Sequence, residues 1–207
     1  MHRLRSATGI IAVITVAVSA LALLWNIGLA ATFWGFTPAL VGVSLTDGLA
    51  IPWWLTPFSS ALLHASWLHL IINIAMLAYV GSQIERVIGP SGLVIAYVVG
   101  ALVAAAAQYV ASPMSIVPMV GASGAISALF GLFAIFFGQP KQVTKNQKLN
   151  RWIHIAWLLA AWIVIQIMTE MLAGGQGVLL ATPAHIGGFV AGLLLHRPLL
   201  LWRYRRA

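Results

Sequence analysis

Charged residues are scarce in this chain. Of its 207 residues, 7% are Asp, Glu, Lys or Arg, whereas 61% are hydrophobic. Because soluble domains carry about a quarter charged residues, this composition excludes a water-soluble domain and indicates a membrane protein. Apolar stretches of about 20 residues, the length that crosses a hydrocarbon layer, recur along the whole sequence. We therefore predict a single all-α, polytopic membrane domain over residues 1–207.

The chain also lacks cysteine, and its only carboxylates are Asp47, Glu85 and Glu170. Without cysteine there is neither a disulfide framework nor a thiol nucleophile. One aspartate is too few for the shared-proton pair of an aspartyl protease, and no His-Glu-x-x-His motif is present to bind a catalytic zinc. We therefore expect no metal and no other cofactor. A Ser-His-Asp triad lacks a suitably placed carboxylate, so a serine–histidine dyad is the nucleophilic chemistry that remains.

Six apolar segments are predicted as transmembrane helices. The first is longer than the apolar core of a signal peptide, which favours an uncleaved anchor. Residues 33–57, which contain Gly, Pro and the pair Trp53-Trp54, are predicted as an outer loop at the membrane interface. Residues 82–91 are predicted as a short connection. The six predicted helices are 9–31, 59–81, 92–110, 120–137, 152–172 and a last one that starts near Pro183 and ends before Arg197.

Basic residues are distributed unevenly between the two sides of this arrangement. The net charge of +8 could suit nucleic acid, but Lys and Arg form short clusters beside apolar segments, and we expect no nucleic-acid partner. With six spans, all eleven Lys and Arg residues fall on the side that holds both termini. The positive-inside rule therefore predicts cytoplasmic termini, with residues 1–8 and 197–207 as cytoplasmic tails.

A run of small residues from Val120 to Ser127 opens the fourth predicted helix, with Ser123 at its centre. Gly121 and Gly124 leave the backbone open around the hydroxyl, so a second chain could approach and nearby N–H groups could face it. On its own, such a run in a membrane protein is more typical of close packing between helices.

Further polar residues are predicted at the same depth of the membrane. His69 and Asn73 are four residues apart and share one face of the second predicted helix. Ser123 and His185 lie near the outer starts of the fourth and sixth. Ionisable residues inside spans are costly and are therefore functional candidates. The alternative for His69 and Asn73 is that they only form hydrogen bonds between helices. His64 stands about 140° round the helix from His69, which favours a framework role.

Three motifs lie on the second, fourth and sixth predicted helices: His64-Ala-Ser-Trp-Leu-His69-Leu-Ile-Ile-Asn73, Gly121-Ala-Ser123-Gly124 and Ala184-His185-Ile-Gly-Gly188. In order, position and topology they resemble the rhomboid intramembrane serine proteases. Glu85-Arg86 followed by Gly89, and Gly188-x-x-x-Gly192, are also similar to family features. The resemblance extends from about the outer loop to the end of the sixth helix, and it implies a rhomboid-like bundle of six transmembrane helices.

This resemblance implies a role for each site residue. Ser123 would be the nucleophile, and His185 the general base that takes its proton and later protonates the leaving amine. His69 and Asn73 would donate hydrogen bonds to the oxyanion, together with the backbone N–H of Ser123. Structural roles would fall to His64, Gly121, Gly124, Gly188 and Gly192.

The function implied is that of an intramembrane serine endopeptidase that cleaves transmembrane helices near the outer membrane face. Its partners would be single-pass or polytopic membrane-protein substrates and membrane lipid, and its location a bacterial plasma membrane. The alternative is a catalytically silent rhomboid-like protein that binds membrane helices, although the complete set of site residues argues against it. A small transporter would need polar residues through both leaflets, and here they gather in the outer half.

Two positions depart from the family pattern. Four residues after Ser123, where relatives often have an aromatic that packs on the histidine ring, this chain has Ser127, so Phe130 or another group would orient His185. In the outer loop, Trp53-Trp54 replaces a Trp-Arg pair found in some relatives.

The fifth predicted helix carries three tryptophans. Trp152, Trp157 and Trp162 are spaced by five residues, which predicts a surface facing lipid or packing against other helices instead of a binding site. The family resemblance implies that this helix and the following Gly174-Gly175-Gln176-Gly177 turn gate the lateral entry of substrate.

Overall fold

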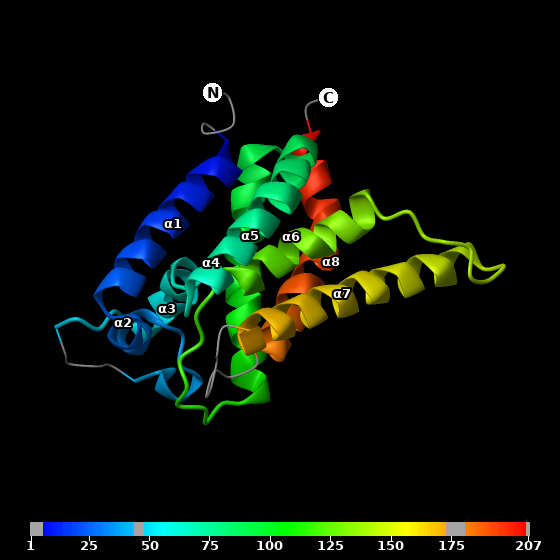
Figure 1. Cartoon of the computed structure of the whole chain (residues 1–207). Helices are drawn as coiled ribbons and strands as arrows, with labels where there is room; N and C mark the ends of the chain where they lie inside the picture. Colours follow the sequence, from blue (N-terminus) through cyan, green and yellow to red (C-terminus); the bar gives the residue numbers. More distant parts are fainter. Residues whose placement is uncertain (1–5, 44–47, 173–180, 206–207) are drawn as a thin grey trace.

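The computed structural model describes residues 6–43, 48–172 and 181–205. Within these ranges the chain is helical apart from loops and one isolated antiparallel bridge, between Phe36 and Met119, which confirms the predicted all-α class. The α-helices of the described residues are shown in Figure 1: α1 (Ala7–Trp25), α2 (Ile27–Trp34), α3 (Thr56–Ser59), α4 (Trp67–Met76), α5 (Ser82–Ala111), α6 (Ser123–Phe136), α7 (Gln147–Leu172) and α8 (Thr182–Arg203). The short helices are η2 (Pro38–Leu40), η3 (Trp53–Leu55), η4 (Ser60–Leu62) and the π-helix η5 (Leu77–Gly81).

Four helical stretches among the described residues are long and apolar enough to cross a membrane: Ala7–Trp25, Trp67–Ala111, Gln147–Thr169 and Thr182–Arg203. The second of these has 45 residues and is broken at Gly89, whose φ of 76° and ψ of 169° interrupt the helix before Pro90. The chain turns back there towards the opposite end of the bundle (Figure 1). With α6 as a shorter apolar helix and both chain ends at one end of the bundle, the arrangement is compatible with the six predicted passes.

The prediction of one continuous helix over residues 9–31 is wrong. The chain breaks at Asn26, which has an extended backbone (φ −165°, ψ 96°). The side chain of Asn26 accepts a hydrogen bond from the backbone N–H of Leu29 at 3.1 Å and so caps α2. An asparagine in an apolar run ends one helix and starts the next, because its amide oxygen satisfies an N–H that a helix start leaves free.

The second predicted span, 59–81, also starts later than expected. α4 begins at Trp67, because the Oγ of Ser66 accepts a hydrogen bond from the backbone N–H of His69 at 3.1 Å and caps the helix. The residues before it form η4 and a non-helical segment that contains His64. Short helices likewise occupy part of the predicted outer loop, in which residues 44–47, including Asp47, lie outside the described residues.

The connection predicted at 82–91 is helical up to its reversal at Gly89. Ile84 and Ile88 are fully buried there, so this segment packs into the bundle as a helix would. A positive φ costs glycine little, which lets a single residue make the turn.

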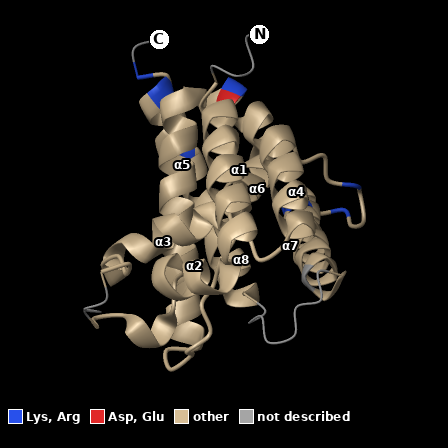
Figure 2. Ribbon diagram, turned by 60° about the vertical axis from the view of Figure 1, so that its left-hand side comes forward, with Lys and Arg blue, Asp and Glu red and all other residues tan. Residues whose placement is uncertain are grey.

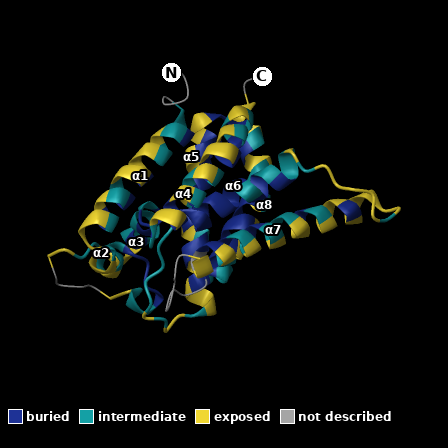
Figure 3. Ribbon diagram, in the orientation of Figure 1, coloured by how far each residue is buried: buried dark blue, intermediate teal, exposed yellow. Residues whose placement is uncertain are grey.

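The core of the bundle lies where α5, α6 and α8 meet. Figure 3 shows buried residues concentrated on these helices, while α1 and α7 flank them with exposed outer faces. α7 packs mainly on α6, with smaller contacts to α4 and α8. α7 therefore lies at the edge of the bundle.

The Glu85 side chain fixes the start of α1. Its carboxylate oxygens accept hydrogen bonds from the backbone N–H groups of Ala7 (2.9 Å) and Thr8 (3.0 Å) and from the Thr8 hydroxyl (2.6 Å). The first N–H groups of a helix have no acceptor within it, and a negative charge there also favours the helix dipole. Glu85 therefore ties α1 to the first leg of α5.

We expect Glu85→Gln to lower the stability of the protein by about 1–2 kcal/mol, because it removes the charge and one of the two acceptor oxygens at this helix start. The thermal unfolding midpoint in detergent measures this. Gln83→Ala is the matched control, since Gln83 lies on the same helix and accepts its hydrogen bond from the exposed Arg86. Equal midpoints for the two variants would contradict a capping role for Glu85.

Candidate active site

The segment before Ser123 is held on two sides. Phe36 and Met119 exchange two backbone hydrogen bonds, of 3.0 and 2.8 Å. Gly121, two residues further on, donates its N–H to the carbonyl of Ser60 at 2.9 Å. The φ of Gly121 is +126°, a value that side chains disfavour, so a glycine suits this position. These bonds set where α6 begins, with Ser123 as its first helical residue.

His64 completes this anchorage. Its Nδ1 lies 2.8 Å from the Oγ of Ser19, whose own proton goes to the carbonyl of Leu62 (2.7 Å). Nδ1 therefore donates, and Nε2 is free to accept the N–H of Ala122 at 3.4 Å. The prediction that His64 points away from His69 is wrong: the two rings meet edge to face with centroids 4.9 Å apart, because His64 precedes the helix and does not follow its periodicity.

Ser123 and His185 meet across the first turns of α6 and α8. The Nε2 of His185 lies 2.9 Å from the Oγ of Ser123, which is hydrogen-bonding distance. Both residues are buried, with exposed fractions of 6% for Ser123 and 2% for His185. A hydroxyl bonded to an imidazole nitrogen in this way can transfer its proton to that nitrogen as the oxygen attacks an electrophile.

Glycines bring these two helices together. A Cβ built on Gly188 would lie 2.1 Å from the carbonyl oxygen of Gly124, and one on Gly192 would lie 2.0 Å from that of Ala128. No side chain fits either place, so α6 and α8 touch backbone to backbone. A Cβ on Gly124 would in turn lie 2.6 Å from the Cβ of Ala104 on α5.

His69 and Asn73 lie one turn apart on α4, on its buried side. The Nδ2 of Asn73 donates to the backbone carbonyl of His69 at 2.9 Å. The Nε2 of His69 and the Oδ1 of Asn73 have no hydrogen-bond partner among the described residues. A Cβ on Gly121 would lie 3.0 Å from that Nε2 and 3.6 Å from the Oγ of Ser123, so the imidazole of His69 and the serine hydroxyl flank the same glycine.

Trp162 of α7 also reaches this site, and the sequence did not single it out. Its Nε1–H donates to the Oγ of Ser127 at 2.7 Å, and its ring meets the ring of His185 edge to face with centroids 6.5 Å apart. Phe130, the aromatic suggested by the sequence, stacks on Trp162 instead, at 4.4 Å and 24°.

Polar residues on α7 could have identified Trp162. Trp162, Gln166 and Thr169 are spaced by four and three residues and share one face, and all three are at most 2% exposed. Polar side chains in an apolar helix mark the face that avoids lipid. Trp152 and Trp157 lie on other faces and are 61% and 67% exposed, as expected of a lipid-facing surface. The predicted gating turn, 174–177, lies outside the described residues.

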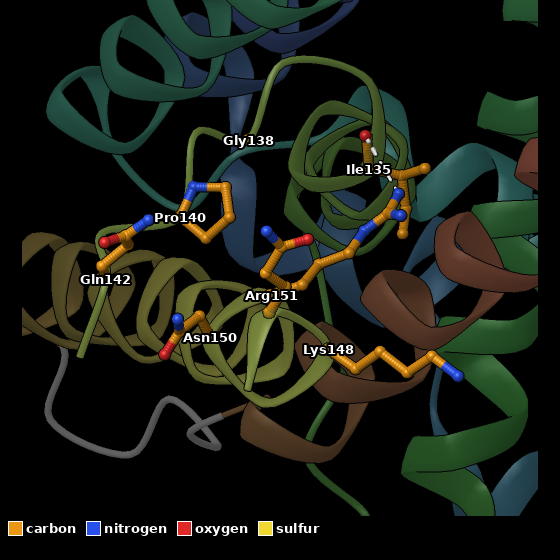
Figure 4. A pocket seen from close by; sticks show the side chains of 8 residues that line it. Ile135, Gly138, Pro140, Gln142, Lys148, Asn150 and Arg151 are labelled. Atoms are coloured by element: carbon orange, nitrogen blue, oxygen red, sulfur yellow. Dashed lines mark hydrogen bonds between the residues drawn. The ribbon is translucent and has the colours of Figure 1, made fainter. Parts of the chain in front are cut away.

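Within the described residues, no three His, Asp or Glu side chains come together as metal ligands would. A cavity of about 580 Å³ opens where α6 leads into α7, lined by Pro140, Gln142, Asn150 and Arg151 among others (Figure 4). In it the guanidinium of Arg151 faces the carbonyl of Ile135 at 3.5 Å. It contains neither Ser123 nor His185.

Comparisons with known proteins agree with the motifs. A model of the rhomboid domain matches residues 52–202. Rhomboid protease GlpG of Pectobacterium atrosepticum is 31% identical over 140 residues, which cover 67% of this chain and 46% of that protein. Putative rhomboid protease YdcA of Bacillus subtilis is 29% identical over 147 residues, or 69% of this chain and 65% of that protein.

A protein of Toxoplasma gondii is also similar to this chain. Rhomboid-like protease 5 of Toxoplasma gondii is 29% identical over 137 residues, which cover 64% of this chain and 14% of that protein. The chain spans about half the length of the first relatives it matches, with 46% of each covered. Because the domain model matches well over half of the chain, this protein belongs to the rhomboid family.

Proposed function

We propose that this protein is an intramembrane serine endopeptidase that cleaves transmembrane helices near the outer membrane face. The observation that carries the proposal is the 2.9 Å contact between the Nε2 of His185 and the Oγ of Ser123 on two tightly packed helices. The related protein of Pectobacterium is named rhomboid protease GlpG, and a protease is the class of activity proposed here.

The reaction proceeds through a covalent acyl-enzyme. The Oγ of Ser123 attacks the scissile carbonyl carbon while the Nε2 of His185 takes the hydroxyl proton. The protonated imidazole then gives this proton to the leaving amide nitrogen, and the C–N bond breaks. In the second half, water attacks the ester, again losing a proton to His185, and Ser123 is released with its proton restored.

The oxyanion of the tetrahedral intermediate needs hydrogen-bond donors. His69 supports this role because its ring flanks Ser123 across Gly121 and its buried Nε2 is unpartnered among the described residues. The amide nitrogen of Asn73 has two protons and gives one to the carbonyl of His69, so the other is available. The first N–H groups of α6, at Ser123, add donors and a favourable helix dipole.

His64 and the glycines hold this arrangement in place. His64 joins α1 to the residue before Ser123, and Gly121 leaves room for the His69 ring. Gly124, Gly188 and Gly192 keep α6 and α8 close enough for the dyad to form. These residues act on the reaction by fixing distances and do not take part in bond formation.

We further propose that both termini face the cytoplasm of a bacterium. Figure 2 supports this orientation, because Lys and Arg residues lie at the end of the bundle that holds the termini and on the connection between α6 and α7. α6 and α8 then start on the outer side, where water can reach the dyad. Single-pass or polytopic membrane proteins would enter from the lipid past α7.

Reconstitution distinguishes an endopeptidase from the alternative, a catalytically inactive protein that binds membrane helices. The full chain is placed in liposomes with a panel of single-span proteins tagged at both ends, and products are read by gel and mass spectrometry. We expect paired fragments cut near the outer boundary of the span. Substrates that copurify with the protein but stay intact throughout the panel would favour the binder.

A further inference from the structure

The geometry points to Trp162 as the positioning residue that orients His185, so that the place of α7 controls the reactivity of the dyad. This inference rests on the Ser123–His185 dyad proposed above. Neither Ser127 nor Phe130 orients His185 directly, and the inference assigns this role to Trp162 on the flanking helix α7.

The first part of the contact is aromatic. The Trp162 and His185 rings meet at an interplanar angle of 71°, with centroids 6.5 Å apart, the edge-to-face geometry that aromatic pairs prefer. Phe130 stacks on Trp162 at 4.4 Å, and Trp162 is 1% exposed, so the indole is itself held firmly. A fixed indole limits how far the imidazole of His185 can rotate away from Ser123.

The second part is a chain of hydrogen bonds that reaches the nucleophile. The indole N–H of Trp162 donates to the Oγ of Ser127 at 2.7 Å, and that hydroxyl donates to the backbone carbonyl of Ser123, also at 2.7 Å. The bonds fix the plane of the indole and join α7 to the first turn of α6. Ser127 is fully buried, and its small side chain lets the indole approach.

From a helix at the edge of the bundle, Trp162 therefore contacts His185 directly and is linked to Ser123 through Ser127. α7 packs mainly on α6, with smaller contacts to α4 and α8. A displacement of α7 breaks the ring contact to His185 and the hydrogen bond to Ser127 together. The dyad is thus oriented when α7 is seated and loosened when α7 moves out.

Fluorophosphonate labelling of the full chain in detergent tests this, since the small probe reports on the dyad without a transmembrane substrate. Trp162→Leu and Trp162→Met remove the ring, and methionine still fills much of the space. We expect each to lower the labelling rate about 10- to 100-fold, and to lower kcat for a reconstituted transmembrane substrate by a similar factor with KM unchanged, as for a misplaced catalytic group. Trp157→Leu, the same exchange on the exposed side of α7, should keep wild-type rates.

Trp162→Phe distinguishes the contribution of the ring contact from that of the hydrogen bond. It can still be measured if Trp162→Leu does not fold. It keeps an aromatic ring near His185 but loses the N–H, so we expect a smaller loss than for Trp162→Met. Folded Trp162 variants labelled at the wild-type rate, even with lower melting temperatures, would overturn this inference alone. A wild-type protein that is not labelled would overturn the proposed function and this inference with it.

Discussion

Replacing His185 by asparagine is expected to lower kcat/KM for a transmembrane substrate by at least about 10⁴-fold, the scale of losing the base of a serine protease. The Nε2 of His185 lies 2.9 Å from the Oγ of Ser123, and no other histidine is hydrogen-bonded to that oxygen among the described residues. A serine hydroxyl without its base is a weak nucleophile at neutral pH. Asparagine keeps a polar side chain at this buried position but cannot accept the proton.

His196→Asn is the matched control for this variant. His196 lies on the same helix, α8, and its Nδ1 contacts the carbonyl of Leu193, one turn back along its own helix. Cleavage of the reconstituted substrate by both variants, normalised to folded protein, is the measurement. We expect the His196 variant to cleave at close to the wild-type rate. A folded His185→Asn protein that retains a tenth of wild-type activity would remove His185 from the reaction.

Asn73→Ala is expected to lower kcat about 10²- to 10³-fold, which is the loss found in other enzymes when a single oxyanion donor is removed. KM should stay unchanged, because the oxyanion forms only in the transition state. Asn73 is fully buried on α4, and its amide bonds within its own helix, to the carbonyl of His69. The loss should therefore appear in kcat much more than in the melting temperature.

Asn150→Ala provides the opposite pattern as a control. Asn150 is also a buried amide, but it holds the connection before α7 through bonds to the backbone of Val143 and Thr144. Its loss should lower the melting temperature and leave kcat per folded molecule near wild type. If Asn73→Ala instead loses stability with an unaltered kcat, Asn73 is part of the framework and not of the oxyanion site.

The proximity of Ser123 and His185, the candidate catalytic residues, could be predicted because their signals in the sequence are local or additive. Ser123 lies between glycines at a helix start, and counting Lys and Arg placed it on the same side of the membrane as His185. The all-α membrane class followed from the composition together with the recurring apolar stretches of about 20 residues. The contact between the two side chains then depends on glycines whose spacing was visible in the sequence.

The helix boundaries could not be predicted in the same way, because hydropathy does not record where a backbone turns. Asn26 and Ser66 cap helices inside apolar runs, and only the bonds they make to Leu29 and His69 reveal it. Gly89 reverses the chain within one residue, where a loop of ten was expected. The assumption of helical periodicity across Ser66 is what misplaced His64.

The role of Trp162 was hidden for a different reason. Three tryptophans on one apolar helix have equal hydropathy, and which of them faces the bundle depends on how α7 packs against α6. Ser127 reads as a loss of the family's aromatic until the indole from another helix is seen bonded to it. A partner from a distant part of the chain cannot be read from the spacing of residues on one helix.

The most direct test of the dyad is to locate the site of fluorophosphonate modification. The purified full chain is labelled in detergent, digested and mapped by mass spectrometry, beside Ser123→Ala. We predict one phosphonylated residue, Ser123, and no adduct on the folded Ser123→Ala protein. An adduct on another serine, or labelling of Ser123→Ala at the wild-type rate, would contradict the assignment of Ser123 as the nucleophile.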